Sequence, residues 1–155
     1  MSFAPVLGID PTAVSDTAEF LLGQHGAVID SPTKLYKYVQ YDTGSAGAAA
    51  VAGEVAYYYT LDGYKLNQVT SDLSDSVEIG AGVLQAVMTD GQFGWIQISG
   101  PATLTIALTA GADGDPLTPT GSADGTLDVS ADVTDNVCAI AGDISDKEII
   151  CTFPL

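Results

Sequence analysis

The residues that could perform chemistry are few and far apart in this chain. His25 is the single histidine and lies in Gly23-Gln24-His25-Gly26, and the two cysteines are Cys138 and Cys151. A nucleophilic site would need folding to bring His25 to a thiol, and a histidine between glycines more often occupies an exposed turn. No nucleophile elbow, His-Glu-x-x-His helix, phosphate-binding loop or dinucleotide fingerprint occurs. We therefore expect no catalytic residues and no enzyme activity.

The best candidate for a metal site is one loop region that holds Asp113, Asp115, Asp124 and Asp128. A calcium loop of the EF-hand type needs acids at alternate positions, a glycine and a terminal glutamate, which Asp113-Gly114-Asp115-Pro116 does not supply. One histidine and two distant cysteines are too few for zinc. We expect solvated turn aspartates, no metal and no cofactor.

The charge excludes two classes of partner. The chain has 155 residues, with 20 acidic residues, four lysines and no arginine, so its formal net charge is −16. Nucleic-acid binding depends on cationic side chains that displace counterions from phosphates, and anionic membranes also attract basic segments. Neither is an expected partner.

Composition favours one domain, mainly β. A hydrophobic fraction of 46% is too high for a disordered acidic chain, and this length is enough for one core. Sixteen aspartates against four glutamates, with 17 glycines, indicate many tight turns rather than helices. We predict a sandwich or barrel of short antiparallel strands.

Alternating apolar residues and turn signals predict the individual elements. Residues 16–22 form either one helical turn or a short strand. Residues 44–53 form a flexible connection or a strand that needs close backbone approach, and residues 111–125 form a polar loop. The predicted strands are 35–41, 55–60, 64–69, 83–89, 93–99, 102–109, 137–141 and 148–153, with Asp62-Gly63, Asp90-Gly91 and Gly100-Pro101 as turns. Trp95 lies among apolar residues and is predicted to be in the core.

An extended N-terminal arm is predicted over residues 1–16, ahead of a single β-rich domain over 17–155. The arm holds two prolines and four large apolar residues, Phe3, Val6, Leu7 and Ile9, without strand periodicity. Those four are candidate interface residues, and the alternative is a first strand on the chain's own core. The arm has no basic signal-peptide region, so we expect a protein that is not exported.

Tyrosines and cysteines support two further hypotheses. Tyr57 and Tyr59 belong to a tyrosine-rich stretch and are candidate interface residues, since tyrosine suits interfaces. If 137–141 and 148–152 form a hairpin centred between Ile144 and Ser145, Cys138 faces Cys151 directly. Free thiols are expected, because cytoplasmic synthesis does not favour disulfides.

Several segments together resemble a known family. Leu35-Tyr36-Lys37-Tyr38-Val39-Gln40-Tyr41 precedes an alanine-rich stretch, 46–55, and later come Gly91-Gln92-Phe93-Gly94-Trp95-Ile96-Gln97-Ile98-Ser99-Gly100-Pro101-Ala102 and Gly111-Ala112-Asp113-Gly114-Asp115-Pro116-Leu117. This succession, over about residues 20–130, resembles the head decoration, or cement, proteins of tailed bacteriophages.

The resemblance implies a non-enzymatic structural protein of the virion, made in the host cytoplasm. Such a protein sits on the capsid exterior as a homotrimer and bridges neighbouring major capsid protein subunits. Two alternatives remain open: another β-rich virion component (tail tube, fibre or spike), and a carbohydrate-binding module in which Trp95 and the tyrosines form a sugar platform.

Overall fold

The chain is almost entirely β, which confirms the predicted fold class. The computed structural model describes residues 5–29, 33–59 and 62–155. Its helical segments are one turn each, α1 (Gly63–Leu66) and the 3₁₀ turn η1 (Leu73–Asp75). The strands are β1 (Val6–Leu7), β2 (His25–Ala27), β3 (Leu35–Tyr41), β4 (Val55–Tyr59), β5 (Gln68–Thr70), β6 (Ser76–Leu84), β7 (Phe93–Thr103), β8 (Pro116–Thr118), β9 (Asp128–Val129), β10 (Ala139–Ala141) and β11 (Glu148–Thr152).

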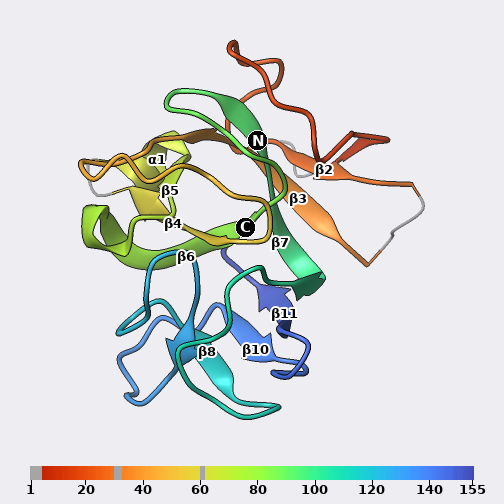
Figure 1. The fold of residues 1–155 in the computed structure, drawn as a ribbon. Helices are drawn as coiled ribbons and strands as arrows, with labels where there is room; N and C mark the ends of the chain where they lie inside the picture. Colours follow the sequence, from red (N-terminus) through yellow and green to blue (C-terminus); the bar gives the residue numbers. More distant parts are fainter. Residues whose placement is uncertain (1–4, 30–32, 60–61) are drawn as a thin grey trace.

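Five strands close into a barrel (Figure 1). The order β3–β5–β4–β6–β7 returns to its start because β7 also pairs with β3. Most of these pairings are antiparallel, as predicted, but β3 and β5 run parallel, as do β1 and β2 at the edge. Closure leaves no free edge on these five strands and gives them a rigid common core.

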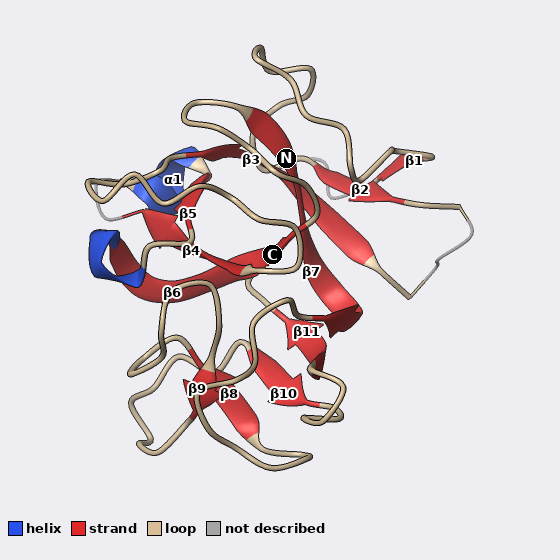
Figure 2. Cartoon of the chain, viewed as in Figure 1, coloured by secondary structure: helices blue, strands red, loops and turns tan. Residues whose placement is uncertain are grey.

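A smaller lobe continues from the same sheet. β7 is long enough to serve both parts: its first half pairs with β3, and Ser99 to Thr103 pair with β11. Beyond β11 the order is β10, β8, β9, and Figure 2 shows these short strands below the barrel. Pairing with a barrel strand makes this lobe an extension of one body.

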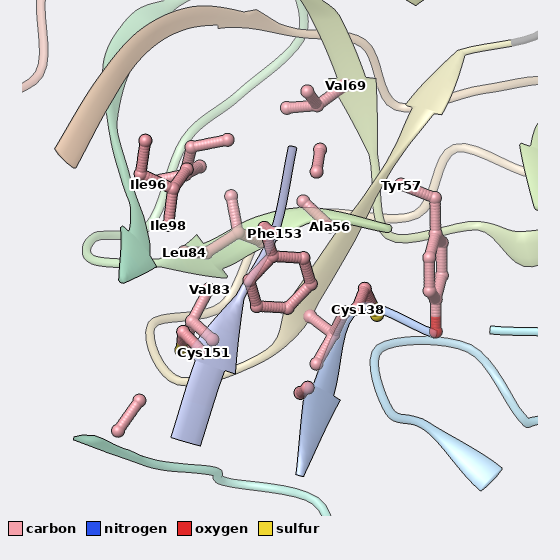
Figure 3. Close-up of a cluster of buried hydrophobic side chains, with 14 of the residues drawn as sticks. Ala56, Tyr57, Val69, Val83, Leu84, Ile96, Ile98, Cys138, Cys151 and Phe153 are labelled. Carbon is pink, nitrogen blue, oxygen red and sulfur yellow. The ribbon is translucent and has the colours of Figure 1, made fainter. Parts of the chain in front are cut away.

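One hydrophobic cluster fills the barrel and reaches the smaller lobe. It includes Val83, Leu84, Ile96 and Ile98 from the barrel, together with Cys138 and Cys151 from the lobe. Figure 3 shows the ring of Phe153 beside Val83 and Leu84, with the two cysteines on either side of it. The shared core explains how strands of two to five residues remain folded in the lobe.

A second cluster covers the outer face of β3 and β7. Tyr38 and Trp95 have ring centroids 5.0 Å apart, and Phe20 packs on both at 5.2 and 5.1 Å. Trp95 is therefore a core residue, as predicted. Ile9 joins them from the N-terminal segment, and a Cβ on Gly26 would lie 2.8 Å from both Ile9 and Trp95. Only glycine allows β2 to approach this closely.

Several predicted strand boundaries are wrong. β6 begins at Ser76 and ends at Leu84, so 83–89 is mostly irregular, and residues 16–22 form neither helix nor strand. Gly100 and Pro101 do not turn the chain: β7 continues through them to Thr103, and β8 lies inside the loop predicted over 111–125. β4 and β5 pair as the predicted hairpin, but α1 occupies part of their connection, and residues 60 and 61 lie outside the described residues.

The aspartates have the turn role that their number predicts. Asp10 accepts hydrogen bonds from Thr12, Asp132 from Thr134, and Asp143 from Ser145, in each case two residues ahead in the chain. The bonds with Ser145 and with the Asp146 amide keep the pKa of Asp143 below its usual value. These local carboxylate turns fix loops that have few apolar contacts.

Candidate functional site

The predicted interface residues of the N-terminal segment occupy different environments. Val6 and Leu7 are exposed on β1, at the edge of the sheet. Ile9 is buried against the chain's own body, and Ser15 pairs with Phe93 of β7. Phe3 lies outside the described residues. Contacts with the chain's own core, the alternative left open by the sequence, therefore hold this segment from Ile9 onward.

Tyr57 is not at the surface, which corrects its assignment as an interface residue. Its ring is fully buried in β4, and its hydroxyl accepts a bond from the Thr126 amide at 3.0 Å while lying within hydrogen-bond distance of the Ala123 and Thr126 carbonyls. Figure 3 shows this hydroxyl directed away from the core cluster. Burial raises the pKa of Tyr57 far above its usual value. The side chain joins the barrel to the loop before β9.

Tyr59 is half-buried at the end of β4, so part of its side chain is available for contact with a partner.

An exposed apolar stripe crosses the smaller lobe. Ile140 of β10 pairs with Ile150 of β11, Ile150 pairs with Pro101 of β7, and Ile140 also pairs with Pro116 of β8. Directly paired residues project from the same face of a sheet. All four are exposed; the isoleucines expose 39% and 47% of their surface.

The strands of the sheet hold this stripe in place. Its four residues come from four adjacent strands, and their neighbours Ala139, Ile149 and Cys151 point inward and are buried. The side chains are therefore held on a rigid sheet and lose little conformational freedom when a partner covers them. Contiguous exposed apolar residues on such a frame make the stripe a candidate protein-binding face.

A pocket of about 550 Å³ lies on the barrel, between residues 21–25 and the strands that they cover. Its walls are Leu21, Leu22, Gly23, Gln24, His25, Lys37, Tyr58, Tyr64, Asn67 and Leu155. Gly23 has a positive φ, and a Cβ there would lie 2.9 Å from the Asn67 amide, so the glycine lets this segment sit against the barrel. The pocket is open to solvent at the exposed side chains of Leu21, Tyr64 and Leu155.

His25 lies on β2, opposite Lys37 of β3, rather than in the expected turn. Partial burial and the nearby Lys37 charge lower its pKa, so it is neutral near pH 7. The two thiols lie apart from it, at the core between β10 and β11, where both are free and buried. Burial raises the pKa of each thiol to about 12, and a protonated buried thiol is a poor nucleophile.

The loop aspartates bind backbone amides of the chain itself. Asp113 accepts from Ile144, Asp115 from Ala112, and Asp124 from Leu73. Across the described residues, histidine, cysteine, aspartate and glutamate side chains form no group of three that could hold a metal ion. Over the same residues, no helix has the length and apolar character of a membrane span.

The stripe was not predicted from the sequence. Ile140 lies in Ala139-Ile140-Ala141, a run with no polar residue to reveal which side of the strand faces solvent. In β11, Glu148 and Thr152 alternate with buried residues and share the exposed face with Ile150, but this pattern alone does not show that Ile150 lies opposite Ile140. The pairing register of β10 and β11 is the information that was missing.

No family model matches this chain, and no curated protein matches it. Among solved structures, the chain is similar to the crystal structure of the head fiber gp8.5 N base in bacteriophage phi29. The identity is 16% and the TM-score 0.49, over 79% of this chain and 98% of that one. A likeness of this degree carries no conclusion about function.

Proposed function

We propose that this chain is a non-enzymatic structural protein of a phage virion that decorates and cements the capsid. The assignment to a phage rests on the sequence segments that resemble head decoration proteins. The observation that carries the binding role is the stripe of Pro101, Ile140, Ile150 and Pro116 across four paired strands. In this proposal, the stripe docks on major capsid protein subunits at the outer surface of the head.

The energetics favour an apolar contact of this kind. Full burial of an isoleucine side chain contributes roughly 1.5–3 kcal/mol, and these two are already partly covered, so each copy gains less than that. Cement proteins act in many copies, so a modest contact repeated over a shell still stabilises it. Apolar contact also suits a chain of net charge −16, because the stripe itself holds no charged residue and its contact does not depend on the charge of the partner.

The proposed particle form is a homotrimer. Three chains carry a formal charge of −48, three times −16, so carboxylates must point outward and contacts between subunits must be apolar or tyrosine-lined. The exposed residues Val6 and Leu7 at the sheet edge and the half-buried Tyr59 are available for these contacts. Salt screens the remaining repulsion between exposed carboxylates.

Quantitative mass spectrometry of purified phage particles tests this function. The proposal expects the chain in hundreds of copies per particle, with loss of head stability against heat or chelators when the gene is deleted. A few copies per particle, or copies found only in tail fractions, would favour the fibre or tail alternative. Glycan binding by an isolated monomer that is absent from particles would favour the carbohydrate-binding alternative.

A further inference from the structure

The Lys37 pocket, the cavity of about 550 Å³ described above, offers a ligand mainly neutral groups. None of its ten lining residues has an acidic side chain. Lys37 is 3% exposed, and its Nζ donates to the Tyr58 hydroxyl at 2.7 Å and to the Pro154 carbonyl at 3.1 Å. Its charge is therefore held inside the protein, and the carboxylate of Leu155, the last residue of the sequence, repels anions. An anionic ligand is not favoured here.

Tyr64 places an aromatic ring at the mouth of the pocket. It lies on α1, is 56% exposed, and packs against the buried Tyr58 with ring centroids 5.0 Å apart and an interplanar angle of 72°. A contact at this angle covers at most one face of the Tyr64 ring, so at least one face stays free of Tyr58. Because a buried residue already positions this ring, little conformational freedom is lost when a ligand stacks on it.

Asn67 and His25 bring unpaired neutral polar groups to the same wall. Both are half-buried, and neither side chain forms a hydrogen bond within the described part of the chain. An amide and a neutral imidazole each donate and accept hydrogen bonds. Burial and the nearby Lys37 charge lower the pKa of His25, so its imidazole is neutral near pH 7. These groups pair with water or with a ligand that also donates and accepts.

The accessible ring is not the one that the sequence indicated for a sugar platform. Trp95 is 2% exposed and packs among Tyr38 and Phe20, so no ligand reaches it. Of the seven tyrosines, five are buried, Tyr59 is half-buried, and Tyr64 is the most exposed. Tyr64 is also the tyrosine with an exposed ring in the pocket wall, next to the unpaired polar groups.

We propose that the Lys37 pocket binds one neutral pyranose unit, either a free sugar or the end of a glycan chain. The C–H face of the sugar ring stacks on Tyr64, and its hydroxyls exchange hydrogen bonds with the Asn67 amide and the His25 imidazole. Sugar hydroxyls donate and accept as these groups do, whereas a carboxylate or phosphate needs an accessible cation. The pocket volume lies in the range of small-molecule sites. This site is independent of the stripe and of the capsid role.

Nuclear magnetic resonance titration at pH 7 with the methyl glycosides of glucose, galactose, mannose and N-acetylglucosamine tests the proposal. Cyclohexanol is the control probe, because it has a six-membered ring with a single hydroxyl. At least one glycoside is expected to bind at millimolar concentration and more tightly than cyclohexanol. No glycoside binding, or cyclohexanol binding as tight as that of the best glycoside, would overturn the proposal.

The disaccharide that ends in the best sugar separates the two sources of the ligand. Tighter binding of the disaccharide indicates the end of a glycan chain, and equal affinity indicates a free sugar; both outcomes support a pyranose site. Sugar binding by a chain that is also abundant in particles leaves the capsid proposal intact.

Substitutions at Tyr64 and Asn67 assign the binding to this wall. Tyr64→Ala is expected to weaken binding of the best glycoside about tenfold, and Tyr64→Phe to preserve it, because the ring remains. Leu66→Ala is the matched control, since Leu66 is an exposed residue of the same helical turn outside the pocket wall. Its affinity should equal that of the unmodified chain, and an unchanged affinity in Tyr64→Ala would overturn the proposal.

Asn67→Gly removes the amide without backbone strain, because Asn67 has a φ of 54° and glycine tolerates this conformation. Glycoside binding is expected to weaken several-fold in this variant. If circular dichroism shows that Tyr64→Ala does not fold, Asn67→Gly decides: unchanged glycoside affinity in that variant overturns the proposal.

Discussion

Ile140 and Ile150 lie directly opposite each other on β10 and β11, and both side chains face solvent. Their chain neighbours face the core. The two isoleucines are therefore exposed because they lie on the outer face of a regular sheet. The cross-strand pair extends to Pro101 and Pro116 on either side. The proposed capsid contact depends on this row of four residues.

Replacing both isoleucines by aspartate is expected to abolish particle binding while the chain stays folded. The pair Ile140→Asp and Ile150→Asp places two charges in the proposed contact, where each would be desolvated without a partner. The substitutions lie on the solvent side of the sheet and should lower the free energy of unfolding by about 1 kcal/mol each, with a further loss because the two like charges lie directly opposite each other. Sedimentation of the variant with heads that lack the native protein measures the binding.

A double variant of equal charge is the control for this experiment. Val87→Asp and Val133→Asp change two exposed valines in loops that contribute no residue to the stripe. Binding of this control should match that of the unmodified protein. If both double variants bind equally well, the stripe is not the contact.

Tyr57→Phe is expected to destabilise the chain by about 1–3 kcal/mol, because the buried Thr126 amide loses its acceptor. Tyr59→Phe should change stability by about 0.5 kcal/mol or less, since its hydroxyl has no hydrogen-bond partner among the described residues. Urea unfolding of the two variants gives both values. Equal losses would show that the Tyr57 hydroxyl does not hold the loop.

Ile9→Ala is expected to cost about 2–4 kcal/mol, because the side chain packs into the cluster around Trp95. Leu7→Ala, two residues away and 70% exposed, should cost about 0.5 kcal/mol or less in the isolated chain. Thermal unfolding compares the two. A negligible effect of Ile9→Ala would mean that the N-terminal segment is not part of the folded body.

Stability is expected to fall as the pH rises from 9 to 11. Burial raises the pKa of Cys138 and Cys151 from 9.0 to about 12, so in this range the unfolded chain releases protons that the folded chain keeps. The raised pKa values of Tyr57 and Tyr58 act in the same direction above pH 10. The pKa of Lys37 is lowered to about 8, so this group alone would make stability rise with pH, but its effect is smaller than that of the two thiols and two tyrosines together.

The urea midpoint measured at pH 8, 9, 10 and 11 tests this sign. The double variant Cys138→Ala and Cys151→Ala should be less stable at pH 7 and should decline less between pH 9 and 11. A midpoint that rises with pH over this interval would contradict the assignment of these thiols to a folded, desolvated core.

Local patterns predicted the barrel strands well where alternation and aromatics coincide. The predicted strand at 35–41 is β3 with identical bounds, and 93–99 is the first half of β7. The inward residues of 102–109 include Ala102 and Leu104, as the alternation indicates, but the strand ends at Thr103. Beyond it, the amides of Leu104 and Thr105 bond to Lys147 and Gly53, so tertiary contacts replace a regular ladder.

Register is the property that the sequence could not supply. The hairpin of β10 and β11 was predicted, but Ala139 and not Cys138 pairs with Cys151, because Gly142 bonds to Glu148 and the turn centres on Ser145. The Lys37 pocket was also beyond prediction, since its walls come from segments around residues 21–25, 37, 58–67 and 155. Long-range assembly, not local propensity, determines both sites.

A cryo-electron microscopy map of the intact phage particle tests the central claim most directly. The account predicts trimeric density for this chain on the outside of the head, with Ile140 and Ile150 buried against a major capsid protein subunit. A map in which the chain is absent from the capsid surface, or in which it attaches with the stripe facing solvent, would contradict the account.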